Sequence, residues 1–276
     1  MNPLRWRNNQ LPTPTNPIYN PHPMTTIPIT DQGGGTAIIW IHGFPLSSRI
    51  FHEQLDIMGA RHLMPDLSGF GRAPEPAGKT TMDSYAREVL AVLDERGIQR
   101  AVFAGFSMGG YVLLAAARLA PQRFAGAILI DTREAADTPE IKKGRYEMMK
   151  KVKEQGVKVV VDAMLPKLLT PKAAPHLVEE VKTMMLSSSA AGVMAALKAM
   201  AERPDSSDLL PRLAVPALVV VGAGDTITPP SDSERMAKLL PRATLVTIPN
   251  AAHLSNLEQP AQFNEAIQEF LRRNQL

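Results

Sequence analysis

A single serine, Ser107, lies among glycines in the stretch "AGFSMGG", residues 104–110. An apolar run, Ala101–Ala104, precedes it and another, Tyr111–Ala117, follows it, so the serine stands where a buried strand would turn into a helix. A Gly-x-Ser-x-Gly turn at such a junction pushes the hydroxyl out of the sheet and directs the N-terminus of the helix toward it. This context favours a nucleophilic serine over one that only packs in a turn.

A serine hydroxyl needs a base to take its proton and a carboxylate to orient that base. His253, in "TIPNAAHLSNLEQP", follows one expected strand, and Asp225, in "LVVVGAGDTITPP", follows the strand before it. Because the carboxyl ends of parallel strands meet at one edge of a sheet, both should lie near Ser107. Asp131 also ends an expected strand and is the rival for the acid; the acid loop around Asp225 favours the latter.

Attack on a carbonyl also requires donors for the oxyanion. We expect one to be the backbone N–H of Met108, directly after the serine, and the other to be the N–H of Phe44 in "IHGFP". Pro45 has no N–H and is excluded. His42, in the same loop, is expected to shape it by hydrogen bonding, and His22, His52, His62 and His176 are expected at the surface.

The surrounding pattern predicts an α/β fold with a mostly parallel sheet and helices on both faces. Residues 31–131 and 208–276 alternate strands and helices and form the predicted core, whereas residues 132–207 contain only helical patterns and form a predicted helical cap after the fourth predicted strand. Residues 1–30 hold seven of the 24 prolines and are expected to be an irregular extension. The predicted strands are Thr36–Ile41, Arg61–Pro65, Ala101–Ala104, Ala125–Ile130, Ala217–Val221 and Ala243–Ile248.

Composition excludes several other classes of function. The net charge of +3 is spread along the 276 residues and only 5% of them are aromatic, which argues against a nucleic-acid partner. Cysteine is absent, which fits a cytoplasmic location, and no apolar run predicts a membrane span or a secretory signal. No metal-ligand spacing is visible, so we expect neither a metal nor another cofactor. The oligomeric state stays open.

The chain resembles serine hydrolases of the α/β-hydrolase fold, in particular carboxylesterases, enol-lactonase-like and acyl-homoserine-lactonase-like proteins. The matching segments are "IHGFPLSSRIF", "PDLSGFGRA", "GFSMGGYVLL", "VVVGAGDTITPP" and "IPNAAHLSNLEQP", within residues 36–273. The resemblance implies the same triad, Ser107, Asp225 and His253, the same oxyanion donors and a cap at 132–207. It departs before residue 36, where the first strands of such a fold should be shortened or missing.

These observations predict a hydrolase for small to medium acyl esters or lactones that are not highly charged. Phe44 and Met108 are expected to wall the substrate pocket, and the methionine-rich cap adds Met164 and Met184 to it. Three alternatives remain: a cofactor-free perhydrolase of the haloperoxidase type, a carbon–carbon bond hydrolase, and a ligand receptor with slow turnover.

Overall fold

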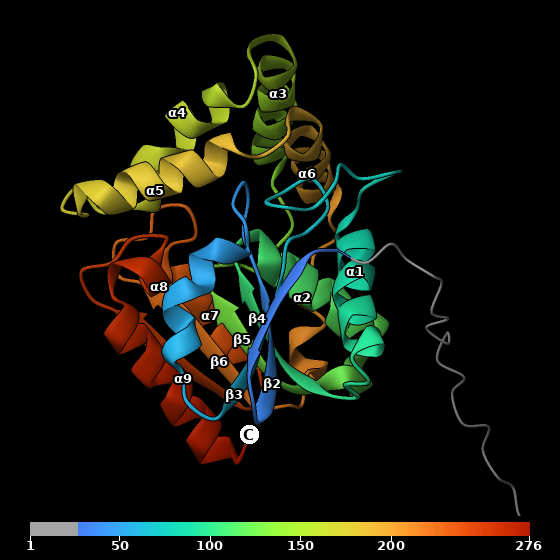
Figure 1. Ribbon diagram of the computed structural model, residues 1–276, viewed down its shortest axis with the longest axis vertical. Helices are drawn as coiled ribbons and strands as arrows, with labels where there is room; N and C mark the ends of the chain where they lie inside the picture. The colour runs from blue at the N-terminus through green and yellow to red at the C-terminus, as the bar shows by residue number, and fades with distance from the viewer. Residues whose placement is uncertain (1–26) are drawn as a thin grey trace, which may run out of the picture.

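The computed structural model describes residues 27–276, so most of the predicted extension lies outside the described residues. Seven strands form one sheet in the order β1-β3-β2-β4-β5-β6-β7 (Figure 1). Only β1 is antiparallel to its neighbour; the other pairs are parallel. The strands are β1 (Ile29–Gly33), β2 (Thr36–Ile41), β3 (Ala60–Pro65), β4 (Ala101–Phe106), β5 (Phe124–Ile130), β6 (Ala217–Gly222) and β7 (Ala243–Ile248).

Both faces of the sheet are buried because helices cover each of them, as the near-continuous apolar strands predict. Alternate side chains of β2 enter different cores: Ile39 packs with residues of α1 and α2, whereas Trp40 packs with residues of η1 and α9. Figure 1 shows α1 and α2 on one side of the sheet and α8 and α9 on the other. The helices around the sheet include η1 (Ser48–Asp56, a 3₁₀ helix), α1 (Met82–Glu95), α2 (Met108–Leu119), α7 (Pro230–Leu239), α8 (Ser255–Glu258) and α9 (Pro260–Asn274).

Strand β1 corrects the lower boundary of the predicted core. The extension was expected to reach residue 30, but Ile29 and Thr30 pair with Pro65 and Met64 of β3. The segment "ITDQG" carries little apolar signal because it is a half-exposed edge strand, held by backbone pairing and by Arg61, whose guanidinium binds Asp31. One short strand therefore precedes β2, which agrees with the expectation that the first strands before residue 36 are shortened.

Four helices follow β5 and lie beyond the sheet in Figure 1: α3 (Pro139–Gln155), α4 (Lys158–Leu168), α5 (Pro175–Leu186) and α6 (Ala190–Glu202). Thr138 caps α3 by accepting from the Ile141 N–H, and Pro139 occupies the first turn, as the sequence predicts. The segment after Val157, whose composition also suits a strand, is helical as predicted. Among the described residues no single helix is long and apolar enough to span a membrane; only the pair α5 and α6, bent by 91°, passes on length and composition.

Candidate active site

Ser107 occupies a strained turn between β4 and α2. Its backbone has φ 52° and ψ −114°, a conformation rare for a residue with a side chain, and its N–H donates to the Ile130 carbonyl at 2.9 Å. The flanking glycines make this turn possible. A Cβ on Gly105 would lie 2.5 Å from the Gly109 carbonyl oxygen, and one on Gly109 would lie 2.0 Å from the Ile41 carbonyl oxygen. The glycine spacing therefore reflects close backbone packing around the serine.

Three side chains from separate loops form a hydrogen-bonded chain at the carboxyl ends of the strands. The His253 Nε2 atom lies 2.9 Å from Ser107 Oγ, and its Nδ1 atom lies 2.8 Å from Asp225 Oδ2. His253 is 1% exposed and Asp225 is 3% exposed, so water hardly competes for these bonds. Each residue follows the end of its strand, and the parallel sheet brings residues separated by more than a hundred positions to one edge.

The local hydrogen bonds keep Asp225 ionised. Burial by itself raises the pKa of this carboxyl, but hydrogen bonding and charge from His253, with hydrogen bonds from Thr228, outweigh burial and lower the pKa overall. Thr228 Oγ1 donates to Oδ2 at 2.6 Å, and the Ile227 N–H donates to Oδ1 at 2.8 Å. An ionised Asp225 can only accept, so Nδ1 of His253 must donate to it and Nε2 is left to accept from the Ser107 hydroxyl.

Asp131, the rival acid, lies beside these three residues but makes its hydrogen bonds to groups other than the imidazole. Its carboxylate accepts from the Gly222 N–H at 2.8 Å and from the Ser255 hydroxyl. Burial and the nearby Asp225 charge raise the pKa of Asp131 well above its ordinary value. Although possible ligand atoms of Asp131, Asp225 and His253 lie within 4.8 Å of one another, hydrogen bonds already engage the two carboxylates and both ring nitrogens. The arrangement suits proton transfer from Ser107.

The loop after β2 lies against the serine. A Cβ on Gly43 would lie 2.7 Å from the Phe106 ring and 3.1 Å from the Ser107 Cβ, so glycine lets this loop lie close to the serine turn. His42 fixes the loop: its Nε2 accepts from the Leu67 N–H at 3.0 Å, and its Nδ1 then donates to the Gly43 carbonyl at 2.9 Å. The Met108 N–H, at the first position of α2, has no partner within its helix. Both predicted oxyanion donors therefore belong to segments adjoining Ser107.

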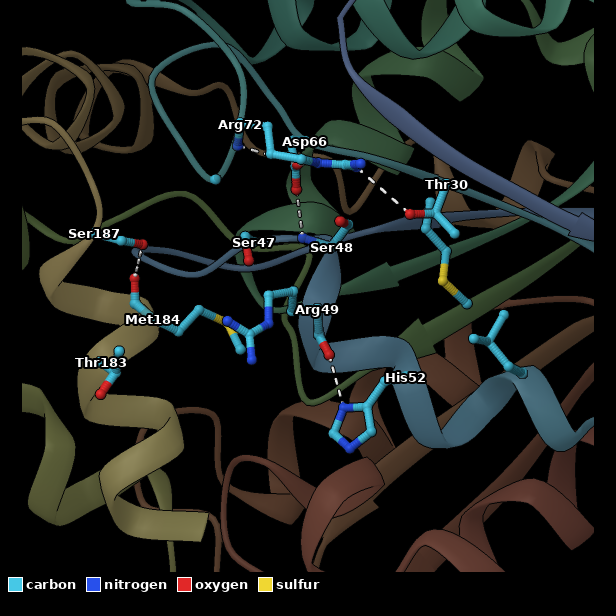
Figure 2. A pocket seen from close by; sticks show the side chains of 13 residues that line it. Thr30, Ser47, Ser48, Arg49, His52, Asp66, Arg72, Thr183, Met184 and Ser187 are labelled. Atoms are coloured by element: carbon cyan, nitrogen blue, oxygen red, sulfur yellow. Dashed lines mark hydrogen bonds and ion pairs between the residues drawn. The ribbon is translucent and has the colours of Figure 1, made fainter. Parts of the chain in front are cut away.

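A cavity of about 350 Å³ opens beside Ser107, between the sheet and helices α3, α4 and α6. Phe44 and Met164 line it, where the sequence places them. Two other expectations are wrong. Met108 does not line this cavity because its side chain is fully buried in the core on the α1 and α2 side. Met184 lines another cavity, of about 490 Å³, because α5 lies over η1 rather than over the serine (Figure 2).

Four polar residues that the sequence did not single out also line the Ser107 cavity: Tyr111, Arg133, Asp137 and Arg145. Nothing in the sequence distinguished Arg145 from its neighbours, since it lies in a basic stretch of a mostly exposed helix.

The expectation that His62 lies at the surface is wrong. It is 2% exposed, accepts from Trp40 Nε1 at 3.1 Å, and has its other ring nitrogen 3.2 Å from the Ile57 carbonyl oxygen.

The mostly parallel sheet, the serine turn and the histidine loop indicate a hydrolase fold, and comparison with known proteins confirms this class. The chain belongs to the alpha/beta hydrolase fold family, whose profile matches residues 36–260. It is similar to an esterase from Thermogutta terrifontis, solved with malate bound, with 38% identity, a TM-score of 0.87, and coverage of 90% of this chain and 93% of that one.

Two further relatives are named as lactonases. The chain is 30% identical over 247 residues to 3-oxoadipate enol-lactonase 2 of Acinetobacter baylyi, covering 88% of this chain and 91% of that protein. The solved enol-lactonase from Burkholderia xenovorans has a TM-score of 0.80 at 25% identity and covers 87% and 92% of the two chains. The protein is therefore a hydrolase of the α/β family with esterases and lactonases among its relatives.

Proposed function

We propose that this protein is a serine hydrolase that cleaves carboxylic esters or lactones through an acyl-enzyme on Ser107. The observation that carries the proposal is the buried chain from Ser107 through His253 to Asp225 at the wall of a 350 Å³ cavity. Its members stand at the spacing that general-base activation of a hydroxyl requires. The names of the esterase and enol-lactonase relatives support the same class of reaction.

In the acylation step, Nε2 of His253 takes the proton of Ser107 as Oγ attacks the substrate carbonyl. Asp225 holds the ring through Nδ1 and stabilises the imidazolium that forms. The N–H groups of Phe44 and Met108 donate to the oxyanion, where loss of one donor typically raises the barrier by about 2.7–4 kcal/mol. The imidazolium then protonates the leaving alkoxide, which departs as an alcohol or, from a lactone, stays attached to the acyl group.

In the deacylation step, the same nitrogen of His253 activates a water molecule that attacks the acyl carbonyl. The collapse of the second tetrahedral intermediate returns the proton to Ser107 Oγ and releases the carboxylic acid. The step uses only the chain's own side chains and water. Residues 132–207 act in this proposal as the cap, because α3, α4 and α6 supply most of the cavity wall facing Ser107.

The test is hydrolysis of p-nitrophenyl acetate, butyrate, octanoate and palmitate, alongside an acyl-homoserine lactone. The wild-type protein is compared with Ser107→Ala and with Ser231→Ala, which removes an exposed serine from α7. We expect many turnovers by the wild type and Ser231→Ala, and loss of nearly all activity in Ser107→Ala. The chain-length profile then measures the reach of the cavity.

Three outcomes would contradict the proposal. A single burst without further turnover would indicate a receptor that hydrolyses its ligand slowly. Unchanged ester hydrolysis in a folded Ser107→Ala variant would show that the serine is not the nucleophile. Efficient peracid formation from acetate and peroxide, with weak ester hydrolysis, would instead favour a perhydrolase.

A further inference from the structure

The wall of the Ser107 cavity carries a cluster with two cations and one anion. Asp137 is shared by two guanidinium groups: Arg203 Nη1 donates to its Oδ1 at 2.6 Å, and Arg145 binds both carboxylate oxygens. The Asp137 side chain is 2% exposed and that of Arg203 is 3% exposed. Arginine stays protonated in proteins, and the two guanidinium groups keep Asp137 ionised, so the cluster has an excess positive charge.

The excess charge is available at Arg145. Both terminal nitrogens of Arg203 are engaged, because Nη1 also donates to the Met200 carbonyl and Nη2 donates to the Ala135 carbonyl, and its guanidinium stacks over the Tyr111 ring at 3.9 Å. By contrast, Nη1 of Arg145 has the Met200 sulfur at 3.3 Å as its only partner among the described residues. A thioether is a weak acceptor, so this donor is poorly satisfied. Arg145 also lines the cavity that contains Ser107.

The neighbouring charges do not cancel this excess. Arg133, the other cation of the cavity wall, lies 3.3 Å from Asp232, which also binds Arg235. Arg235 in turn pairs with Glu134, so that group holds equal numbers of cations and anions. Asp205, the acid near Arg203, is exposed to water and accepts from two backbone N–H groups. Its charge is screened by solvent.

We infer that the substrate of this site is an ester or lactone carrying one carboxylate, which Arg145 binds while the reacting carbonyl lies at Ser107. The inference rests on the proposed function and names the substrate class within it. An anionic group would give the poorly satisfied Nη1 donor a strong acceptor and would neutralise the excess charge of the cluster. The apolar walls, which include Phe44, Met148, Met164 and Leu197, suit a short hydrocarbon spacer between the carboxylate and the carbonyl. The expectation of substrates that are not highly charged is thereby narrowed to substrates with one negative charge.

The experiment compares pairs of esters in which one member carries a carboxylate and the other carries a neutral group at the same position. On the acyl side, the p-nitrophenyl monoester of adipic acid is paired with p-nitrophenyl 6-methylheptanoate, in which an isopropyl group replaces the carboxylate. On the alcohol side, 4-acetoxybenzoate is paired with its methyl ester. We expect the wild type to prefer the carboxylate in at least one pair by about tenfold or more in kcat/KM, the ratio that corresponds to about 1.4 kcal/mol.

Arg145→Met should remove that preference, because it should lower kcat/KM for the carboxylate ester about tenfold more than for its neutral partner. Asp137 keeps Arg203 as its partner in this variant, so the cluster retains a balanced ion pair. Arg145→Lys should restore part of the preference. Lys143→Met makes the same charge change on the same helix at a side chain that is 80% exposed, and it should keep the wild-type preference.

If Arg145→Met fails to fold, Arg145→Gln and the wild-type ratios still decide the question. Equal or better hydrolysis of the neutral ester in both pairs by the wild type would overturn the inference. An equal loss on charged and neutral esters in Arg145→Met would overturn it too. Both results leave the proposed function intact, because they require Ser107-dependent hydrolysis; absence of that hydrolysis on every ester would instead overturn the proposed function itself.

Discussion

The carboxylate of Asp131 accepts a hydrogen bond from the hydroxyl of Ser255 across 124 positions of the sequence, directly beside the acid that contacts His253. The two buried carboxylates thus lie close together, but only Asp225 is hydrogen-bonded to the imidazole. Because like charges at this separation disfavour each other, one carboxylate keeps its charge through His253 and the other retains a proton to higher pH.

Asp131→Asn tests this division of roles. The folded protein holds a proton on Asp131 above pH 3.8, where the unfolded chain has lost it, so the contribution of Asp131 to stability falls as pH rises toward its raised pKa. Asparagine removes this penalty and tolerates the positive φ of 43° at this position. We expect the free energy of unfolding of the variant, relative to wild type, to increase as pH rises above about 4 in urea titrations.

A difference in unfolding free energy between wild type and Asp131→Asn that does not change with pH would contradict this assignment.

Catalytic activity distinguishes the two carboxylates in a second way. Asp225→Asn removes the charged acceptor that orients His253 and should lower kcat by about 10⁴-fold, the size of the loss for this change in a Ser-His-Asp triad. Asp131→Asn should lower kcat far less, since its carboxylate makes its hydrogen bonds to groups other than the ring.

Gly109→Ala should disrupt the serine turn. The added Cβ would lie 2.0 Å from the Ile41 carbonyl oxygen, and neither backbone segment can move without displacing Ser107 or the Phe44 loop. We expect a loss of about 3 kcal/mol in the free energy of unfolding, measured by urea titration. Gly144→Ala on α3 is the matched control, because nothing lies within 4 Å of its new Cβ. It should stabilise the helix by up to about 1 kcal/mol, and equal effects of the two changes would refute the argument.

His62→Asn should reduce the sensitivity of the protein to acid. Burial lowers the pKa of His62 below 6.5, so the unfolded chain binds a proton there before the folded protein does, and stability falls as pH drops below this value. Asparagine can still accept from Trp40 but does not titrate. Between about pH 7 and about pH 5 the wild type should lose more free energy of unfolding than the variant. His52→Asn, at an exposed position, is the control; a loss in His62→Asn equal to wild type would contradict the prediction.

The order of elements and the residues that follow the strands could be predicted from the sequence because those signals are local. The apolar run before Ser107 and the glycines around it are contiguous, and the strands before Asp225 and His253 are short and strongly apolar. The edge strand β1 was not predictable in this way. Its pairing with β3 comes from backbone hydrogen bonds that leave little trace in side-chain hydrophobicity.

By itself, the sequence determined an α/β sheet and the set of residues gathered at its carboxyl edge, since strand direction carries every strand-ending side chain to the same side. Only the tertiary structure decided which carboxylate lies on His253, which methionines face the serine, and where a charge excess remains. Asp225 hydrogen-bonds to His253 whereas Asp131 hydrogen-bonds to Gly222 and Ser255, and Met164 and Met184 line different cavities. Such distinctions depend on distances between segments far apart in the chain, which local patterns do not encode.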